Sequence, residues 1–128
     1  AGCGFSTGTP WLPVPPEHRT LAVNRQQSEP GSVLNAYRVF MRWRREQPAL
    51  RYGDIRFVDA PEDALCFIRE YQGQKLLACF NFARSARTVR LPDDGPIEVL
   101  TGHGFPHATW EQQRVTIPAC GAFFAYLQ

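Results

Sequence analysis

The sequence predicts an α+β fold: an irregular loop and one long helix, followed by an antiparallel β-sandwich domain. Three observations lead to this prediction. Residues 1–31 are rich in turn formers and show little periodicity. The following segment, up to residue 47, repeats apolar side chains at helical spacing. From residue 53 onward, short runs rich in β-formers alternate with turn sequences, which is typical of strands.

The first element is a proline-rich aromatic loop, GTPWLPVPPEH at residues 8–18. Proline fixes φ and removes a backbone donor, so the neighbouring apolar residues cannot join a regular helix or a central strand. These prolines are Pro10, Pro13, Pro15 and Pro16, and the apolar residues are Phe5, Trp11, Leu12 and Val14. A loop this stiff normally lies on a scaffold, and we expect that scaffold to be missing from these residues.

The second element is a helix predicted over residues 28–47. Ser28 is expected to be its N-cap, Pro30 falls in the first turn, and Pro48 should end it. One face is apolar and the other carries arginines, which predicts an amphipathic helix with more apolar surface than a small sheet can cover. The apolar face consists of Val33, Leu34, Tyr37, Phe40 and Met41, and the opposite face of Arg38, Arg42 and Arg45.

The remaining elements are strands. Turn formers separate them at the short spacing of an antiparallel sandwich with meander or Greek-key connections. The predicted strands are Asp54–Asp59, Ala64–Tyr71, Lys75–Phe82, Arg87–Leu91, Ile97–Leu100, Arg114–Ile117 and Ala122–Leu127.

One hairpin has a predictable register. If Gln72 and Gly73 form a two-residue turn, Glu70 faces Lys75 and Cys66 faces Cys79. The cysteines then form a non-hydrogen-bonded pair, whose side chains lie closest, so a disulfide is conceivable. We favour two small buried hydrophobic side chains instead. Both faces of the hairpin are apolar away from the turn, so we expect it to be central and covered on both sides.

Composition excludes several functions. The formal net charge of +2 is too small to indicate nucleic-acid binding, and no run is long enough to cross a membrane. The four cysteines form neither a CxxC pattern nor a dense disulfide framework. No signal-peptide segment is present, so reduced thiols and a cytoplasmic location are expected, and no cofactor is indicated.

Sites with catalytic or ligand-binding chemistry are not indicated either. His103 and His107 are four residues apart, but Gly104 and Pro106 prevent the helix that would direct both at one metal ion. The early glycines lack the strand and helix of a phosphate loop. The serines have no nucleophile-elbow context, and the carboxylates fall at caps, turns and polar faces. We therefore predict no catalytic residue and no metal site.

The order of motifs resembles α-glucosidases of glycoside hydrolase family 13, in the α-amylase superfamily. GFSTGTPWLPV, then VNRQQSEPGSVLNAYRVFMRWRREQPALRYGDIRF, is similar to the C-terminal portion of oligo-1,6-glucosidase-like members. The later stretches CFNF and IPACGAFFAYL fit the same layout. The resemblance implies that residues 1–50 are the last βα loop and last helix of a (β/α)8 barrel. Residues 51–128 would be the C-terminal antiparallel β-sandwich domain.

The family's chemistry is retaining glycoside hydrolysis by two carboxylates. Those residues come from earlier barrel strands, and no stretch here matches their motifs, so this chain alone is predicted to be inactive. Active sites of such barrels are built from the βα loops. The resemblance thus makes Phe5, Thr9 and Trp11 candidates for the substrate-binding rim, with the anchoring of the loop on the barrel as an alternative role for Trp11. Its implied partners are the N-terminal catalytic barrel and an α-glucoside or oligosaccharide.

Two other functions compete with a non-catalytic part of an α-glucosidase. An independent carbohydrate-binding module usually presents aromatic side chains along one exposed strand face. Here the aromatic residues are expected in the loop, the helix and buried strands. The arginine-rich helix face, which also includes Arg44, would suit a basic-helix interaction domain. Amphipathic helices usually carry such a charged outer face, so this pattern is weak support.

Overall fold

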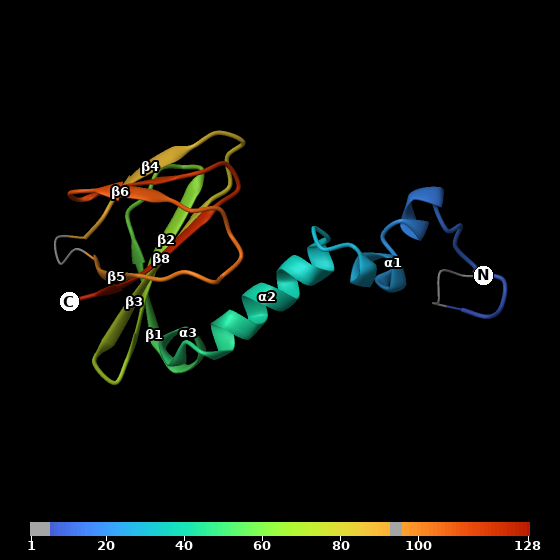
Figure 1. The fold of residues 1–128 in the computed structure, drawn as a ribbon, viewed down its shortest axis with the longest axis horizontal. Helices are drawn as coiled ribbons and strands as arrows, with labels where there is room; N and C mark the ends of the chain where they lie inside the picture. The colour runs from blue at the N-terminus through green and yellow to red at the C-terminus, as the bar shows by residue number, and fades with distance from the viewer. Residues whose placement is uncertain (1–5, 93–95) are drawn as a thin grey trace. The chain divides into compact units, whose positions relative to one another are not determined.

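The computed structural model describes residues 6–92 and 96–128, and its elements follow the predicted order of loop, helix and strands (Figure 1). The chain divides into two units, Ala1–Met41 and Arg42–Gln128, which are described separately below. This division falls inside the long helix. The limits 1–50 and 51–128, which concern a larger enzyme, stay a prediction.

The first unit contains more regular structure than the sequence predicted. A 3₁₀ helix covers Pro16–Arg19, and helix α1 covers Val23–Ser28. The proline-rich pattern hid the first of these, because proline is compatible with the first turn of a helix. α1 is only six residues long, too short for its apolar periodicity to stand out.

Helix α2 covers Val33–Arg45, so the prediction that Ser28 is its N-cap was wrong. Ser28 ends α1 instead, where its hydroxyl donates to the carbonyl of Arg25 at 3.0 Å. Ser32 occupies the cap position of α2, and its Oγ accepts a hydrogen bond from the Asn35 backbone N–H at 3.2 Å. The Asn35 side chain also donates to the Glu29 carbonyl at 2.8 Å, which fixes the turn between the helices.

Pro48 marks the end of the long helix, as predicted. α2 stops at Arg45, and Gln47, the residue before the proline, has an extended backbone with φ −105° and ψ 95°. Pro48 then begins a separate short helix, α3, at Pro48–Tyr52. Proline is well suited to this first helical position because its missing N–H would be unpaired there anyway. In the second unit, α3 buries Ala49 and Leu50 and contacts strands β2 (Ala64–Tyr71) and β3 (Gln74–Asn81).

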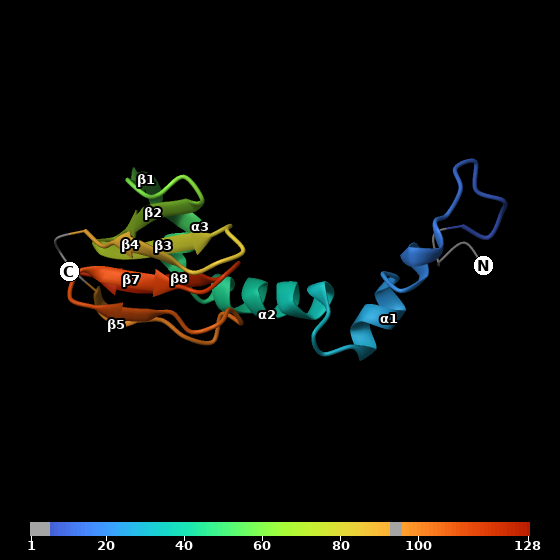
Figure 2. The same ribbon diagram turned by 90° about the horizontal axis from the view of Figure 1, so that it is seen from above.

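The second unit is a sandwich of two antiparallel sheets, as predicted (Figures 1 and 2). One sheet has five strands in the order β1-β2-β3-β8-β5, and the other has three in the order β4-β7-β6. The strands are β1 Asp54–Val58, β2 Ala64–Tyr71, β3 Gln74–Asn81, β4 Arg87–Arg90, β5 Pro96–Val99, β6 Thr109–Glu111, β7 Arg114–Ile117 and β8 Ala122–Leu127.

The register predicted for the β2–β3 hairpin is confirmed. Glu70 lies opposite Lys75, and Cys66 lies opposite Cys79. The turn residues Gln72 and Gly73 have φ values of 51° and 80°, which fit the type I′ turn that matches the twist of the strands. Strand β6 was missed, because its three residues are all exposed and show no apolar alternation.

The core lies between the two sheets. The five-stranded sheet contributes alternate residues of β2, β3 and β8, and the small sheet contributes alternate residues of β4 and β7. These residues include Ile68, Leu77, Phe123, Leu127, Val89, Val115 and Ile117. Cys66 and Cys79 lie in the same core and are free thiols, in agreement with the preferred interpretation. The hydrogen bond that the Cys79 thiol donates to Cys66 raises the pKa of Cys79, and burial raises it further.

Asn81, the third residue of CFNF, connects the end of β3 to the chain between β7 and β8. Its Nδ2 donates to the carbonyls of Ser85, Ile117 and Pro118 at 2.9, 3.0 and 2.9 Å. Its Oδ1 accepts from the Ala83 backbone N–H at 2.9 Å. This side chain is almost fully buried, so its hydrogen bonds replace those that water would otherwise make.

Candidate functional site

Of the candidate rim residues, Thr9 and Trp11 lie in the proline-rich loop of the first unit. Phe5 lies outside the described residues. Thr9 and Trp11 are exposed, and Trp11 exposes 91% of its surface. The loop contains a local hydrogen bond from the Gly8 backbone N–H to Ser6 Oγ at 3.1 Å. Within this chain Trp11 is therefore not buried, and its indole ring is accessible to a ligand or to another protein surface.

The segment after the loop is held by hydrogen bonds of its own. Thr20 Oγ1 donates to the Glu17 carbonyl at 2.7 Å, next to the 3₁₀ helix. Gln26 Nε2 donates to the Leu21 carbonyl at 2.6 Å, and its Oε1 accepts from the Leu34 backbone N–H at 3.0 Å. Gln26 thus ties the end of the loop to the start of α2. These bonds order the segment that follows the loop, and Trp11 lies before that segment.

The two histidines singled out by sequence have different environments. His103 is buried among Trp43, Phe105 and Phe124, with ring centroids 5.0–5.8 Å away. Its Nδ1 accepts a hydrogen bond from the Phe105 backbone N–H at 3.2 Å. Burial lowers the pKa of His103, against a smaller raising effect of the Leu100 backbone. His103 is a buried packing residue of the second unit, outside the core between the sheets.

His107 is exposed. Within residues 6–92 and 96–128, no group of three or more His, Cys, Asp or Glu side chains could hold a metal ion. No helix in these ranges is long and apolar enough to cross a membrane. The ion pair between Asp63 and Arg87, with 2.8 Å between Oδ2 and Nη2, fastens the turn before β2 to β4. It joins a turn to a strand and does not resemble a pair of catalytic carboxylates.

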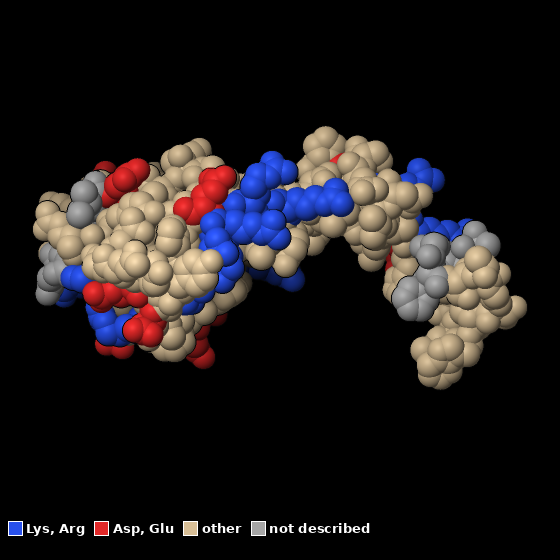
Figure 3. Space-filling model, turned by 90° about the horizontal axis from the view of Figure 1, so that it is seen from below, with Lys and Arg blue, Asp and Glu red and all other residues tan. Residues whose placement is uncertain are grey.

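The arginines gather over α2, as Figure 3 shows. Three of them lie in the last turn of the helix, where positive charge interacts favourably with the helix dipole. Arg44 donates to the Leu50 carbonyl at 2.9 Å, which caps α3. Arg51 lies over the Tyr52 ring at 4.6 Å. Arg44 and Arg51 therefore serve local structure, which leaves less of this charge for an external partner.

Sequence reasoning missed an exposed aromatic surface on the five-stranded sheet. The prediction that the β2–β3 hairpin is covered on both sides was wrong in part. The face opposite the small sheet is covered near β8 by Trp43, His103 and Phe105, but Phe57 and Phe82 are each 66% exposed. The sequence contained an indication of this surface, because Ile55 and Phe57 alternate along β1 and therefore share this face.

The domain profile described as "Maltogenic Amylase, C-terminal domain" matches residues 55–124. A probable α-glucosidase of Rhizobium meliloti (strain 1021) is 42% identical over 97% of the chain. A probable oligo-1,6-glucosidase 2 of Bacillus subtilis (strain 168) is 34% identical over 70% of the chain. The chain spans 22% of the first protein's length and 16% of the second's.

Solved structures agree. The α-glucosyl transfer enzyme XgtA matches 98% of the chain with 36% identity and a TM-score of 0.88, and the match spans 23% of that enzyme. The trehalulose synthase MutB from Pseudomonas mesoacidophila MX-45 matches 98% of the chain with 29% identity and a TM-score of 0.82. The match again spans 23% of the enzyme. The chain therefore belongs to the maltogenic amylase C-terminal domain family, and it is a C-terminal portion of the α-glucosidase type of glycoside hydrolase family 13.

Proposed function

We propose that this chain is the non-catalytic C-terminal part of a retaining α-glucosidase that acts on α-linked glucosides or oligosaccharides. Residues 1–50 are its last βα loop and last barrel helix, and residues 51–128 are the sandwich domain after the barrel. The observation that carries this proposal is the similarity over 97% of the chain, at 42% identity, to a probable α-glucosidase. The similarity includes the loop and the helix as well as the sandwich.

The exposed face of α2 supports a role in a barrel wall. Val33 and Tyr37 are 79% and 60% exposed, and they belong to the apolar face predicted from the sequence. Helices on the outside of such a barrel bury their apolar face against the parallel strands. The same face left in water would favour self-association. The partner of this face is thus proposed to be the N-terminal catalytic barrel of the same enzyme.

The exposed indole of Trp11 supports a place on the rim of a sugar pocket. Binding pockets of (β/α)8 barrels are lined by βα loops, and flat aromatic rings are well suited to sugar faces. We propose that Trp11 contacts the α-glucoside, with Thr9 and Phe5 as further rim residues. The chain then supplies shape and contact area at the pocket entrance, and no proton or nucleophile.

The bond-breaking chemistry is proposed to lie in the preceding part of the enzyme. Retention needs a carboxylate nucleophile and a carboxylic acid about 5 Å apart, one on each side of the glycosidic bond. The residues of this chain orient the sugar and complete the fold around that pair. The free thiols of Cys66 and Cys79 fit the predicted cytoplasmic location, since a reducing compartment keeps two facing cysteines in the thiol form.

The proposal is tested with the full-length parent enzyme. We expect it to release glucose from p-nitrophenyl α-glucoside, maltose or isomaltose, with the α-anomer as the first product in ¹H NMR. Trp11→Ala should raise KM for the oligosaccharides, whereas Trp110→Ala, on the small sheet, should leave KM unchanged. A full-length enzyme without activity on any α-glucoside contradicts the proposal. Glucose transfer in place of hydrolysis would narrow it to α-glucosyl transfer.

A further inference from the structure

The open face of the five-stranded sheet carries a row of residues that lie directly opposite one another on four strands. The row runs Phe57, Phe67, Ala78 and Phe124 across β1, β2, β3 and β8. Its exposure falls steadily along the row: Phe57 is 66% exposed, Phe67 is half-buried, and the last two residues are buried. The face is therefore covered at one side and open at the other.

The covered side is the one where the chain enters the sandwich. Trp43, from the last turn of α2, contacts Phe124 with ring centroids 4.7 Å apart. The Tyr126 hydroxyl donates to Gln47 Oε1 at 2.6 Å, just before α3. His103 closes the same region from the loop before β6. The polypeptide that precedes the sandwich thus already packs on this face, next to its open half.

The open half consists of four phenylalanines in a chain of ring contacts. Phe57, Phe67, Phe80 and Phe82, the phenylalanine strip, follow one another with ring centroids 6.3, 6.0 and 6.5 Å apart. At typical aromatic areas of 150–250 Å², two rings exposed to two-thirds already present roughly 200–300 Å² of apolar surface. Soluble domains seldom expose more than a few hundred Å² in one patch without a partner.

Two further apolar residues flank the phenylalanine strip on its own face. Leu65 and Ile55 flank it and are both exposed. Arg69 lies further along β2 on the same face. Its side chain is already hydrogen-bonded within the domain, because Nε donates to the Gly53 carbonyl at 3.0 Å. A sugar-binding platform needs polar groups around its aromatic rings to recognise hydroxyl groups. An apolar strip with apolar flanks is better suited to a protein surface than to a carbohydrate.

We propose that the phenylalanine strip is the docking surface of the sandwich for the preceding, catalytic part of the same polypeptide. This inference rests on the proposed function, and it names the surface that the partner occupies. The related enzymes are more than four times as long as the chain, so each has a large body of protein available to cover it. Covalent connection through the covered side gives that body a high effective concentration at the strip.

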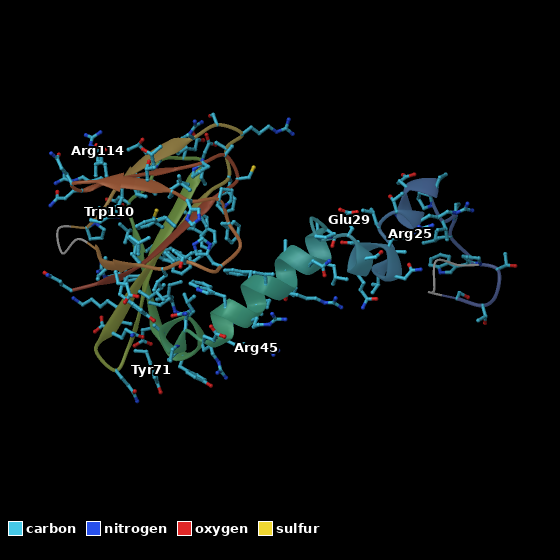
Figure 4. The ribbon with its side chains drawn as sticks, viewed as in Figure 1. Arg25, Glu29, Arg45, Tyr71, Trp110 and Arg114 are labelled. Carbon is cyan, nitrogen blue, oxygen red and sulfur yellow. The ribbon has the colours of Figure 1, made fainter. Side chains whose placement is uncertain are left out.

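The first test is hydroxyl-radical footprinting of the full-length parent enzyme, read by mass spectrometry at individual side chains. Each rate is compared with the rate for the same residue in the denatured enzyme. We expect oxidation of Phe57 and Phe82 to be almost lost in the native enzyme. Trp110 (labelled in Figure 4) is the control, because it is 43% exposed on β6 of the small sheet, whereas the strip belongs to the five-stranded sheet. It should keep a large part of its oxidation rate.

The second test identifies the occupant. Replacement of Phe82 by p-benzoylphenylalanine in the full-length enzyme, followed by irradiation, should give a cross-link to a peptide from the preceding part of the same polypeptide. The same replacement at Trp110 should give little cross-linked product. A mixture of isotopically light and heavy enzyme distinguishes links within one molecule from links between two copies.

Three results would overturn the inference. One is unprotected oxidation of Phe57 and Phe82. Another is protection that appears only at high enzyme concentration, with mixed-isotope cross-links, because a second copy would then cover the strip. The third is protection that appears only when maltose is added, because the strip would then be a sugar platform. If the enzyme hydrolyses α-glucosides in any of these cases, the docking inference fails while the proposed function stands.

Discussion

Replacement of Asn81 tests whether one buried amide holds the end of β3 against the β7–β8 connection. Asn81→Ala removes the acceptor of the Ala83 N–H and the donor of three carbonyls, those of Ser85, Ile117 and Pro118. A buried hydrogen bond contributes about 1 kcal/mol, and an orphaned buried group costs about 1–3 kcal/mol. Water can reach some of these groups in the space left by the amide. We expect a loss of about 3 kcal/mol in the free energy of unfolding.

The assay is urea unfolding of the purified chain at neutral pH, followed by tryptophan fluorescence. Thr88→Ala is the control, because it removes one exposed hydroxyl contact, 3.0 Å from Thr116 Oγ1, and surface changes of this kind stay within about 0.5 kcal/mol. Asn81→Asp should destabilise the chain at least as much as Asn81→Ala, since its carboxylate would face three carbonyl oxygens. A loss below about 1 kcal/mol for Asn81→Ala would refute the reasoning, because it would mean that the buried network adds little.

Three further predictions concern other positions. Gly53→Ala should lower the free energy of unfolding by about 2 kcal/mol or more, because the added Cβ would lie 2.7 Å from two backbone oxygens, whereas Gly31→Ala meets nothing within 4 Å; parallel urea titrations compare them. The pKa of His103 is lowered by burial, so the unfolded chain takes up the proton first as the pH falls. The free energy of unfolding should therefore decline below about pH 6.5, and His103→Gln should lack that decline. Equal slopes of unfolding free energy against pH in the two proteins would contradict this. Trp11→Ala should change the unfolding free energy by less than about 0.5 kcal/mol, since Trp11 is exposed; a larger loss would show that it anchors the loop.

The sandwich was predictable because its signals are local. The turn at Gln72 and Gly73 fixes the register of a hairpin, and the register places Cys66 opposite Cys79. The strands with alternating burial were found, while β6, with three exposed residues, carries no such alternation. The helix boundaries were less predictable, because both Ser28 and Ser32 are acceptable caps. Hydrogen bonds that Asn35 donates and one that Gln26 accepts decide between them, and no pattern in the sequence indicates these bonds.

The candidate site was predictable only through the resemblance to a family. Nothing in the composition of the loop distinguishes Trp11 as a sugar contact from Trp11 as an anchor. The exposed strip on the sheet was missed for a physical reason. Alternation tells which residues share a face, but whether that face is covered depends on distant residues such as Trp43 and His103. A strand with apolar residues on both sides can be buried in the chain itself or against protein outside it.

Turnover of p-nitrophenyl α-glucoside by the purified 128-residue chain, next to the full-length parent enzyme at equal molarity, tests the central claim most directly. The account predicts release of p-nitrophenol by the full-length enzyme and none above the uncatalysed rate by a chain that unfolds cooperatively in urea. The chain is produced in a host that lacks α-glucosidases, so that no contaminating enzyme contributes. Sustained turnover by the chain alone would then contradict the claim that the catalytic carboxylates lie outside it.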